Sequence, residues 1–261
     1  MAVRIECQSM SFRYNKKPVL ENISFSARAS TFSAILGRNG SGKTTLLHTL
    51  NGINRPYKGE VLINNRSAAA MSQKKIARQV SLVPQEHNEI FPFKVLDVVV
   101  MGRAPFLKMT SSPGPEDYRL AMDALKTLKA ESMAENNFNA ISGGERQIAL
   151  LAAALVQSSQ TMLLDEPTNH LDFNNQYLLL STIKKLCQAK GLCVIASMHD
   201  PNMAMLFADQ VIMMEKGNIL FQGSACETMT KKNIDRLFQL DSAAIELPDK
   251  KRLFLPAHVF E

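Results

Sequence analysis

The sequence has few of the features that mark secreted, membrane-spanning or fibrous chains. Its four cysteines form no C-x-x-C pair, so neither a zinc site nor a disulfide framework is indicated, and a reducing compartment fits. The longest uninterrupted apolar run, residues 148–156, is much too short to cross a bilayer. Polar residues occur throughout residues 1–10, so we expect no signal peptide. No internal repeat, low-complexity tract or heptad pattern is present.

Charge of one sign is not concentrated anywhere in the sequence. Thirty Lys and Arg against 24 Asp and Glu give a formal net charge of +6, but there is no basic run. This excess of positive charge could favour binding to an anionic surface, but an ordinary basic protein has it as well. We expect no nucleic-acid partner. With 261 residues, 46% hydrophobic and 21% charged, the chain has the size and composition of one large globular domain.

A phosphate-binding pattern is the strongest feature that is present. Residues 37–44 read G-R-N-G-S-G-K-T and fit G-x-x-x-x-G-K-[ST] between an apolar strand pattern and a helix pattern. Curled backbone amides and the helix N-terminus there would attract phosphates, with the lysine on the β- and γ-phosphates and the threonine hydroxyl on Mg²⁺. The residues predicted to bind a nucleoside triphosphate are Gly37, Arg38, Asn39, Gly40, Ser41, Gly42, Lys43, Thr44 and Thr45.

Strand and helix patterns alternate along most of the chain, which indicates an α/β fold with a mostly parallel sheet. Residues 86–158 differ, because their apolar residues follow helical spacing. The predicted strands are 3–7, 10–14, 23–27, 31–36, 60–63, 80–83, 161–165, 193–198, 211–214 and 219–222. The predicted helices are 74–79, 95–102, 115–130, 142–157, 174–189 and 201–207.

A second pattern typical of phosphate chemistry is an apolar strand that ends in two acids, T-M-L-L-D-E at residues 161–166. In a parallel sheet the carboxyl ends of strands gather ligands. Two adjacent carboxylates repel each other unless a cation or separate roles offset this. We therefore expect Asp165 to hold Mg²⁺ and Glu166 to polarise the water that attacks the γ-phosphate. Alone, the pair could equally be a solvated turn before Pro167.

Residues 141–147, I-S-G-G-E-R-Q, hold a third pattern. Ser142 and Glu145 have the spacing of a capping box, which any helix may use. Two glycines between them are unfavourable in a first helical turn. They are useful where a large ligand approaches the backbone closely, and a triphosphate at this helix N-terminus is such a ligand.

Together these motifs resemble the ATP-binding cassette (ABC) ATPases over nearly the whole chain. Residues 141–147 match the family's signature segment, with Ile and Glu where Leu and Gln are commonest. Gln85 matches the Q-loop glutamine, which contacts Mg²⁺ and the attacking water. His199 matches the switch histidine on the γ-phosphate. Residues 167–172, P-T-N-H-L-D, resemble the D-loop, which places Asp172 at a dimer contact. Tyr14 matches the aromatic residue that stacks on adenine.

The resemblance implies one ABC ATPase domain over residues 1–261. Residues 1–85 and 159–222 would form the nucleotide-binding core, a phosphate-loop NTPase fold with an antiparallel β subdomain. Residues 86–158 would be an inserted α-helical subdomain that carries the signature, and residues 223–261 a C-terminal tail. The expected catalytic residues are Glu166, His199, Gln85 and Lys43, and the expected Mg²⁺ residues are Thr44, Gln85 and Asp165.

In this family the phosphate loop of one subunit faces the signature of another. The resemblance therefore implies a homodimer in which Ser142, Gly143, Gly144 and Glu145 bind ATP in trans. Residues 93–106 resemble the subgroup that powers importers of iron chelates, haem and cobalamin; iron–siderophore is the first expectation, and molybdate a more distant one. Partners would be two transmembrane permease subunits and, indirectly, an extracytoplasmic substrate-binding protein, with the ATPase peripheral on the cytoplasmic face of the membrane.

Three features depart from the subgroup's pattern. Arg38 occupies a position that is often Pro, and Ile148 and Ala153 stand where many members have arginine. None of these differences removes a catalytic group. The absence of arginine at positions 148 and 153 could alter the packing of the helical subdomain and the coupling of ATP hydrolysis to transport. Two rival functions remain open at this point: a cassette ATPase in translation or DNA repair, and a phosphate-loop kinase, which would need no second subunit.

Overall fold

The structure is a computed structural model that describes residues 2–85, 92–108, 110–169 and 171–257. The first residues of the predicted helical subdomain, 86–91, and His170 in the D-loop string lie outside this part. Within the described part, no helix combines the length and apolar character needed to span a membrane.

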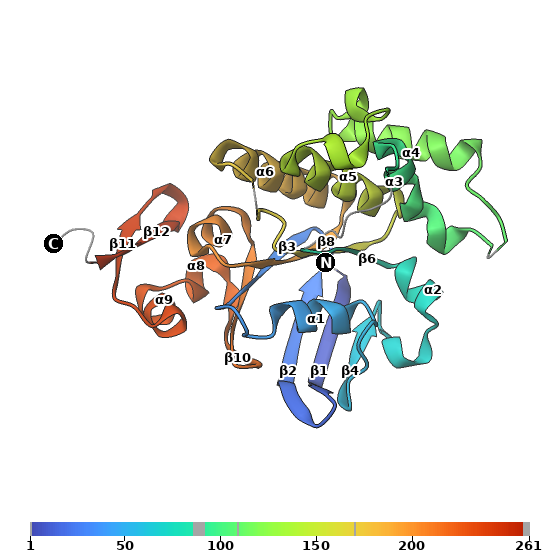
Figure 1. The fold of residues 1–261 in the computed structure, drawn as a ribbon. Helices are drawn as coiled ribbons and strands as arrows, with labels where there is room; N and C mark the ends of the chain where they lie inside the picture. Colours follow the sequence, from blue (N-terminus) through green and yellow to red (C-terminus); the bar gives the residue numbers. More distant parts are fainter. Residues whose placement is uncertain (1, 86–91, 109, 170, 258–261) are drawn as a thin grey trace.

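A six-stranded sheet forms the centre of the molecule (Figure 1). Its strand order is β10-β9-β3-β8-β7-β6, and five strands run parallel while β10 pairs antiparallel with β9 at one edge. The strands are β3 (Thr31–Leu36), β6 (Val80–Val83), β7 (Thr161–Asp165), β8 (Cys193–Met198), β9 (Gln210–Glu215) and β10 (Asn218–Ser224). In β3, β7 and β8 every residue is buried, as expected for strands that are covered on both faces.

Helices cover one face of this sheet, and α1 with a second sheet covers the other (Figure 1). The second sheet is antiparallel, in the order β2-β1-β4-β5. Its strands are β1 (Val3–Tyr14), β2 (Lys17–Arg28), β4 (Lys58–Ile63) and β5 (Arg66–Ser67). The α-helices are α1 (Lys43–Leu50), α2 (Gln73–Ala77), α3 (Val95–Val100), α4 (Pro115–Thr127), α5 (Gly143–Val156), α6 (Phe173–Lys190), α7 (Pro201–Phe207), α8 (Ala225–Thr228) and α9 (Lys231–Phe238). The α/β class and the mostly parallel sheet are therefore confirmed.

The prediction of two separate strands at residues 3–7 and 10–14 was wrong, because the structure has one strand, β1, across both. The pairing register with β2 shifts between Cys7 and Met10, and Ser9 has a φ of 48°. This is a β-bulge, in which one strand holds an extra residue and bends. The polar pair Gln8-Ser9 interrupts the alternation of apolar residues, and that interruption resembled a turn in the sequence.

A helical unit built from α3, α4 and α5 has its own apolar core (Figure 1). A 3-10 helix, η2 (Met101–Phe106), follows α3 directly, so the predicted helix at 95–102 ends earlier as an α-helix. Gly102 lies where η2 crosses α5: a Cβ there would be 2.1 Å from the carbonyl oxygen of Ala153. The atom of Ala153 that Gly102 meets belongs to the backbone, which every residue type has, so this close crossing depends on Gly102.

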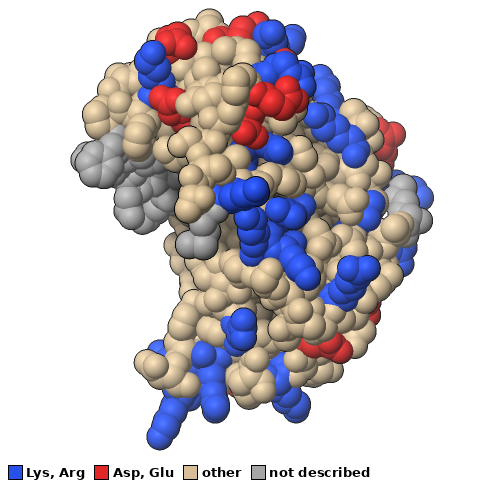
Figure 2. Space-filling view, turned by 90° about the vertical axis from the view of Figure 1, so that its right-hand side faces the viewer, with Lys and Arg blue, Asp and Glu red and all other residues tan. Residues whose placement is uncertain are grey.

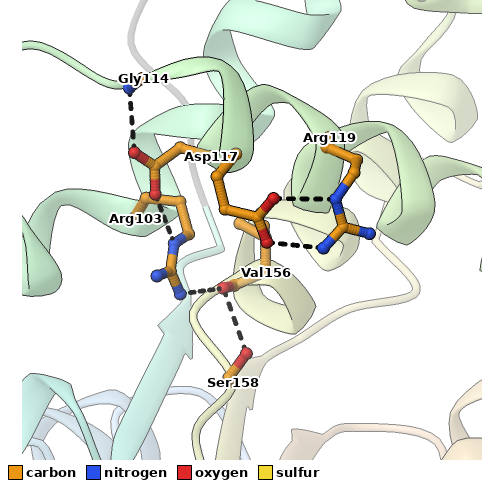
Figure 3. A network of polar contacts seen from close by, with 7 residues as sticks. Arg103, Gly114, Asp117, Arg119, Val156 and Ser158 are labelled. Carbon is orange, nitrogen blue, oxygen red and sulfur yellow. Dashed lines mark hydrogen bonds and ion pairs between the residues drawn. The ribbon is translucent and has the colours of Figure 1, made fainter.

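Arg103 joins three helices of this unit (Figure 3). Its Nε donates to Asp117 of α4 at 2.9 Å, and its Nη1 donates to the carbonyl of Val156 at the end of α5. The backbone N–H of Gly114 also donates to Asp117, at 3.0 Å. This N–H first, and then Arg103, lower the pKa of Asp117 below its usual value. The carboxylate therefore stays ionised to lower pH than an ordinary aspartate, and the ionised form caps α4 and holds Arg103.

The C-terminal residues form structure that the sequence patterns did not predict. After α9, strands β11 (Ser242–Glu246) and β12 (Arg252–Pro256) form a hairpin at the far end of the molecule from α4 (Figure 1). Asn202 of α7 exchanges two hydrogen bonds with the backbone of Phe254, at 2.8 and 3.1 Å. Ile234 and Leu237 of α9 are buried in the core that covers the central sheet. The tail is thus attached to the nucleotide-binding core.

The face that carries α2 is basic. Figure 2 shows Lys and Arg side chains gathered across the middle of this face and Asp and Glu side chains above them. The sequence from Val61 to Gln85, which includes α2, contains four cations and no acid. Arg78, the C-cap of α2, donates to the carbonyl of Pro105 at 2.9 Å and lies 5.3 Å from the centre of the Phe106 ring. These contacts attach α2 to η2.

Candidate nucleotide-binding site

The phosphate loop connects β3 to α1, and its shape requires glycine at specific points. Gly42 precedes α1 with a φ of 101°, in the left-handed region that favours glycine. Gly37 has no positive φ, but a Cβ there would lie 2.5 Å from both the Met214 carbonyl oxygen and Ser41 Oγ. Gly37 therefore allows the loop to pack on strand β9, and Gly42 turns it into the helix.

Lys43 occupies the centre of the loop. Its side chain is 5% exposed, and its Nζ donates to the carbonyl oxygens of Gly37 at 2.9 Å and Arg38 at 3.4 Å. The same Nζ lies 3.6 Å from Glu166 Oε1. A buried ammonium needs such partners, because desolvation without them is costly. The acidic pair at the end of β7 therefore reaches the phosphate loop, although 123 positions separate Lys43 and Glu166 in the sequence.

The loop fits a phosphate ligand in two respects. Ser41 Oγ is buried without a hydrogen-bond partner among the described residues, although buried hydroxyls usually have one. The first amides of α1 have no acceptor within the helix, and the helix dipole makes this end partially positive. A triphosphate would supply acceptors to both sets of donors.

Asp165 and Glu166 have different surroundings, which gives them different roles. Asp165 is 1% exposed, and the hydroxyl of Ser197 donates to its Oδ1 at 2.5 Å. The Ser197 hydroxyl also accepts from the backbone N–H of Glu166 at 2.8 Å. Ser197 thus connects the ends of β7 and β8. Glu166 itself has a φ of 46°, a conformation that is uncommon for a residue with a side chain and that recurs at functional sites.

Two amides hold the Glu166 carboxylate in the cavity. Gln85 Nε2 donates to Oε2 at 3.0 Å, and Asn169 Nδ2 donates to the same oxygen at 2.6 Å. Sequence reasoning assigned a role to Gln85 but none to Asn169 or Ser197. The signal for Ser197 was a polar residue inside a wholly apolar strand pattern. Asn169 lies three residues after Glu166, where a side chain can reach back across a turn.

A cavity of about 700 Å³ brings these groups together. It is lined by the phosphate loop, Gln85, Glu166, Asn169 and His199, which come from the ends of β3, β6, β7 and β8. His199 follows directly on β8 and is exposed to the cavity. The complete lining is Val19, Asn39, Gly40, Ser41, Gly42, Lys43, Thr44, Thr45, Gln85, Glu166, Asn169 and His199.

The signature segment lies elsewhere in the same chain. Ser142 and Glu145 form the capping box of α5: the Ser142 N–H and hydroxyl each donate to Glu145 Oε2 at 2.8 Å. These two hydrogen bonds lower the pKa of Glu145, the backbone one more strongly. Among the described residues, none of this segment lines the phosphate-loop cavity. Ser142, Gly144 and Glu145 instead line a small cavity beside Leu171 and Asn175.

The predicted site residues outside the cavity lining also include Gly37, Arg38, Asp165, Tyr14 and Asp172. Tyr14 is on β1, half exposed, with its ring 4.8 Å from that of Phe12 and its hydroxyl accepting from Asn54. Asp172 caps α6 by accepting from the backbone N–H and the side-chain amide of Asn175, at 2.8 and 2.9 Å. An adenine contact for Tyr14 and a dimer contact for Asp172 therefore stay predictions.

A magnesium ion fits this donor set only together with a nucleotide. In the part of the chain that the structure describes, no group of three or more His, Cys, Asp or Glu side chains could hold a metal. Mg²⁺ in phosphate-transfer sites is bound by one or two carboxylates, substrate phosphates and waters. Thr44 in the cavity lining and Asp165 behind it would supply the few oxygen ligands that such a site needs.

The fold and the cavity define a phosphate-loop nucleoside triphosphatase, with the loop, an acidic strand end and a histidine at neighbouring strand ends. The comparisons specify the family. A model of the ABC transporter family matches residues 20–169, more than half of the chain. The chain belongs to the ABC transporter family as an ATP-binding subunit, a class that hydrolyses ATP to power transport.

Individual relatives cover nearly the whole chain. The hemin import ATP-binding protein HmuV of Thermobifida fusca is 33% identical, over 94% of this chain and 86% of that protein. The iron(3+)-hydroxamate import ATP-binding protein FhuC of Bacillus subtilis is 30% identical, over 94% of this chain and 91% of that protein.

Solved structures show the same similarity. An inward-facing metal-chelate type ABC transporter has a TM-score of 0.85 and 30% identity, with 97% of both chains covered. A dimeric bacterial ABC transporter cassette has a TM-score of 0.74 and 26% identity, with 85% of this chain and 98% of that chain covered. The ABC resemblance stated from the sequence is thereby confirmed.

Proposed function

We propose that this chain is the ATPase of an importer for a metal chelate, with an iron–siderophore or haem as the substrate class. The observation that carries the proposal is the similarity, over more than nine-tenths of the chain, to proteins named for hemin and iron(3+)-hydroxamate import. The metal-chelate type transporter structure supports it. The relatives described above are transport proteins, so none of them favours a role in translation, DNA repair or phosphorylation of a small molecule.

In the proposed site, each residue acts through the contacts that surround it. Lys43 and the loop amides would bind the β- and γ-phosphates. Thr44, Gln85 and Asp165 would hold Mg²⁺, which would neutralise charge on the phosphates. Glu166 accepts hydrogen bonds from Gln85 and Asn169, which orient the carboxylate to polarise the attacking water. His199, exposed to the cavity, contacts the γ-phosphate. Tyr14 stacks on adenine.

We further propose that two copies of the chain form a head-to-tail dimer. The signature segment and the phosphate loop line separate cavities of one chain, so a single copy does not bring them together. The N-terminus of α5, with Ser142 and Gly144, would bind the ATP held by the partner's phosphate loop. Asp172, at the start of α6, would lie at the dimer contact. The dimeric cassette described among the similar structures supports a dimer.

The proposed location is the cytoplasmic face of the membrane, where the dimer would bind two permease subunits. An extracytoplasmic binding protein would deliver the substrate to them. ATP-driven closing and opening of the dimer would move the permease, because a ligand shifts an equilibrium toward the state that it binds better. The substrate itself would not touch this chain.

Uptake measured in cells that lack the gene tests the substrate class. We expect loss of uptake of labelled ferric hydroxamate or haem, restored by the wild-type gene and not by Glu166→Gln, which keeps the cavity but removes the carboxylate. Glu135→Gln is the matched control, because Glu135 is an exposed acid on the helical unit. If only molybdate uptake were lost, the chain would serve a molybdate importer and the chelate proposal would be wrong. Unchanged uptake of all three compounds would contradict a role in the import of any of them.

A further inference from the structure

A side-chain hydrogen bond joins the phosphate loop to the C-terminal tail. Arg38, the second residue of the loop, donates from Nη1 to the side-chain oxygen of Gln239 at 2.7 Å. Gln239 is the C-cap of α9, 201 positions away and well beyond the segment that the family model matches. The predicted role of Arg38 was an ATP contact, but Arg38 does not line the phosphate-loop cavity.

A second cavity adjoins the nucleotide cavity at the loop. Its lining includes Arg38, Leu237 and Gln239. The two cavities share Asn39, Gly40 and Ser41, so both border the same loop residues. The Arg38–Gln239 bond therefore contacts the loop beside the phosphate site and not within it.

The backbone of Arg38 is part of the loop geometry. Its carbonyl accepts from the Ser41 N–H at 3.1 Å and from Lys43 Nζ at 3.4 Å. A shift of this peptide would therefore move an acceptor of the lysine that meets the phosphates. The Arg38 side chain is on the surface, where it would rotate freely without a partner. The hydrogen bond to Gln239 holds it in one position.

Gln239 is itself held in place. Leu237, two residues before it, is 1% exposed, and Gln239 has a φ of 57°, which ends the helix. Arg236 of α9 also lies 3.6 Å from Glu215 at the end of β9. Helix α9 is thus attached to the core through Leu237 and to the end of β9 through Arg236. Glu215 and Lys216 are the other charged groups that line the cavity around Arg38.

We propose that Gln239 is a positioning residue for the phosphate loop, so that helix α9 sets the affinity of the loop for ATP. This inference rests on ATP binding at the loop. It gives the C-terminal tail a role in the catalytic cycle: any partner or change that displaces α9 would weaken nucleotide binding without touching the catalytic groups.

Steady-state ATPase measurements on the full chain test this proposal. Gln239→Leu removes the acceptor and keeps the side-chain size; we expect KM for ATP to rise about fivefold with kcat unchanged, the factor that one average hydrogen bond is worth. Gln239→Glu keeps an oxygen that can accept from Arg38, and we expect this variant to keep the wild-type KM. Gln8→Leu is the control, because Gln8 makes a comparable exposed bond to Glu6 on β1.

A double-mutant cycle with Arg38→Ala shows whether the two residues act together. We expect the double variant to have the KM of Arg38→Ala alone. A wild-type KM for Gln239→Leu, additive effects in the double variant, or a raised KM for Gln239→Glu would each overturn the proposal. Lys43→Ala separates this from the ATP site itself: if it abolishes ATP binding while Gln239→Leu changes nothing, the nucleotide site is correct and the support by α9 is not.

Discussion

Ser197 shows how a single side chain can maintain the acidic end of β7. Its hydroxyl donates to one oxygen of Asp165 and accepts from the N–H of Glu166, so it satisfies a buried carboxylate and a backbone amide at once. Strands β7 and β8 pair Asp165 with Ser197 directly across the sheet, which fixes this geometry. Glu166 can therefore keep its unusual φ while its carboxylate points into the cavity.

Ser197→Ala should lower the free energy of unfolding by roughly 1–3 kcal/mol, because it leaves Asp165 and the Glu166 N–H unpaired in the interior. Ser33→Ala is a matched control. Ser33 lies on the neighbouring strand β3 and is also buried, but its hydroxyl has no partner among the described residues. We expect that control to stay within about 0.5 kcal/mol of wild type. Urea denaturation measures both; equal effects in the two variants would contradict this account of Ser197.

At the scale of elements, the contact between η2 and α5 determines how the helical unit is assembled. Gly102 is not required for its backbone angle; it is required because the Ala153 carbonyl leaves no room for a Cβ. Arg103, the next residue, then reaches both Asp117 and the end of α5 (Figure 3). Packing and polar contacts at adjacent positions therefore hold α3, α4 and α5 in one arrangement.

Gly102→Ala should reduce stability by roughly 1–3 kcal/mol, since a methyl group would have to displace backbone atoms of α5. Gly114→Ala is the control: it also lies in the helical unit, and a Cβ there would meet nothing within 4 Å. Thermal unfolding followed by circular dichroism measures the difference. A Gly114→Ala variant as unstable as Gly102→Ala would show that loss of glycine, and not the crowding at Ala153, causes the effect.

The sequence predicts those elements whose signals are local. The loop at residues 37–44, the acidic end of β7 and the capping box at Ser142 each depend on neighbours in the chain, and the structure has each of them in place. The bulge at Ser9 was missed because its cause is a shift in pairing with β2. The hairpin β11–β12 was missed because α7 contributes contacts that stabilise it, such as Asn202 with Phe254.

At the scale of the whole molecule, the cavity groups come from four strand ends of one sheet, whereas the signature belongs to the separate core of the helical unit. Parallel strands bring their carboxyl ends to one edge, so Lys43, Gln85, Glu166 and His199 can meet despite their sequence separation. Among the described residues, none of the signature segment lines that cavity. The proposed completion of the site by a second copy rests on this separation.

Mixing two inactive variants tests this completion in trans. Lys43→Ala should lose ATP binding at its own loop, and Ser142→Arg should block the signature that faces the partner's loop, so each homodimer should be inactive. In a mixed dimer both changes fall on the same composite site, and the other site is intact. Equal amounts should therefore recover about a quarter of wild-type ATPase activity, because half of the dimers are mixed and each has one of two sites. An inactive mixture that nevertheless forms mixed dimers, detected with two affinity tags, would contradict the formation of one working site in trans.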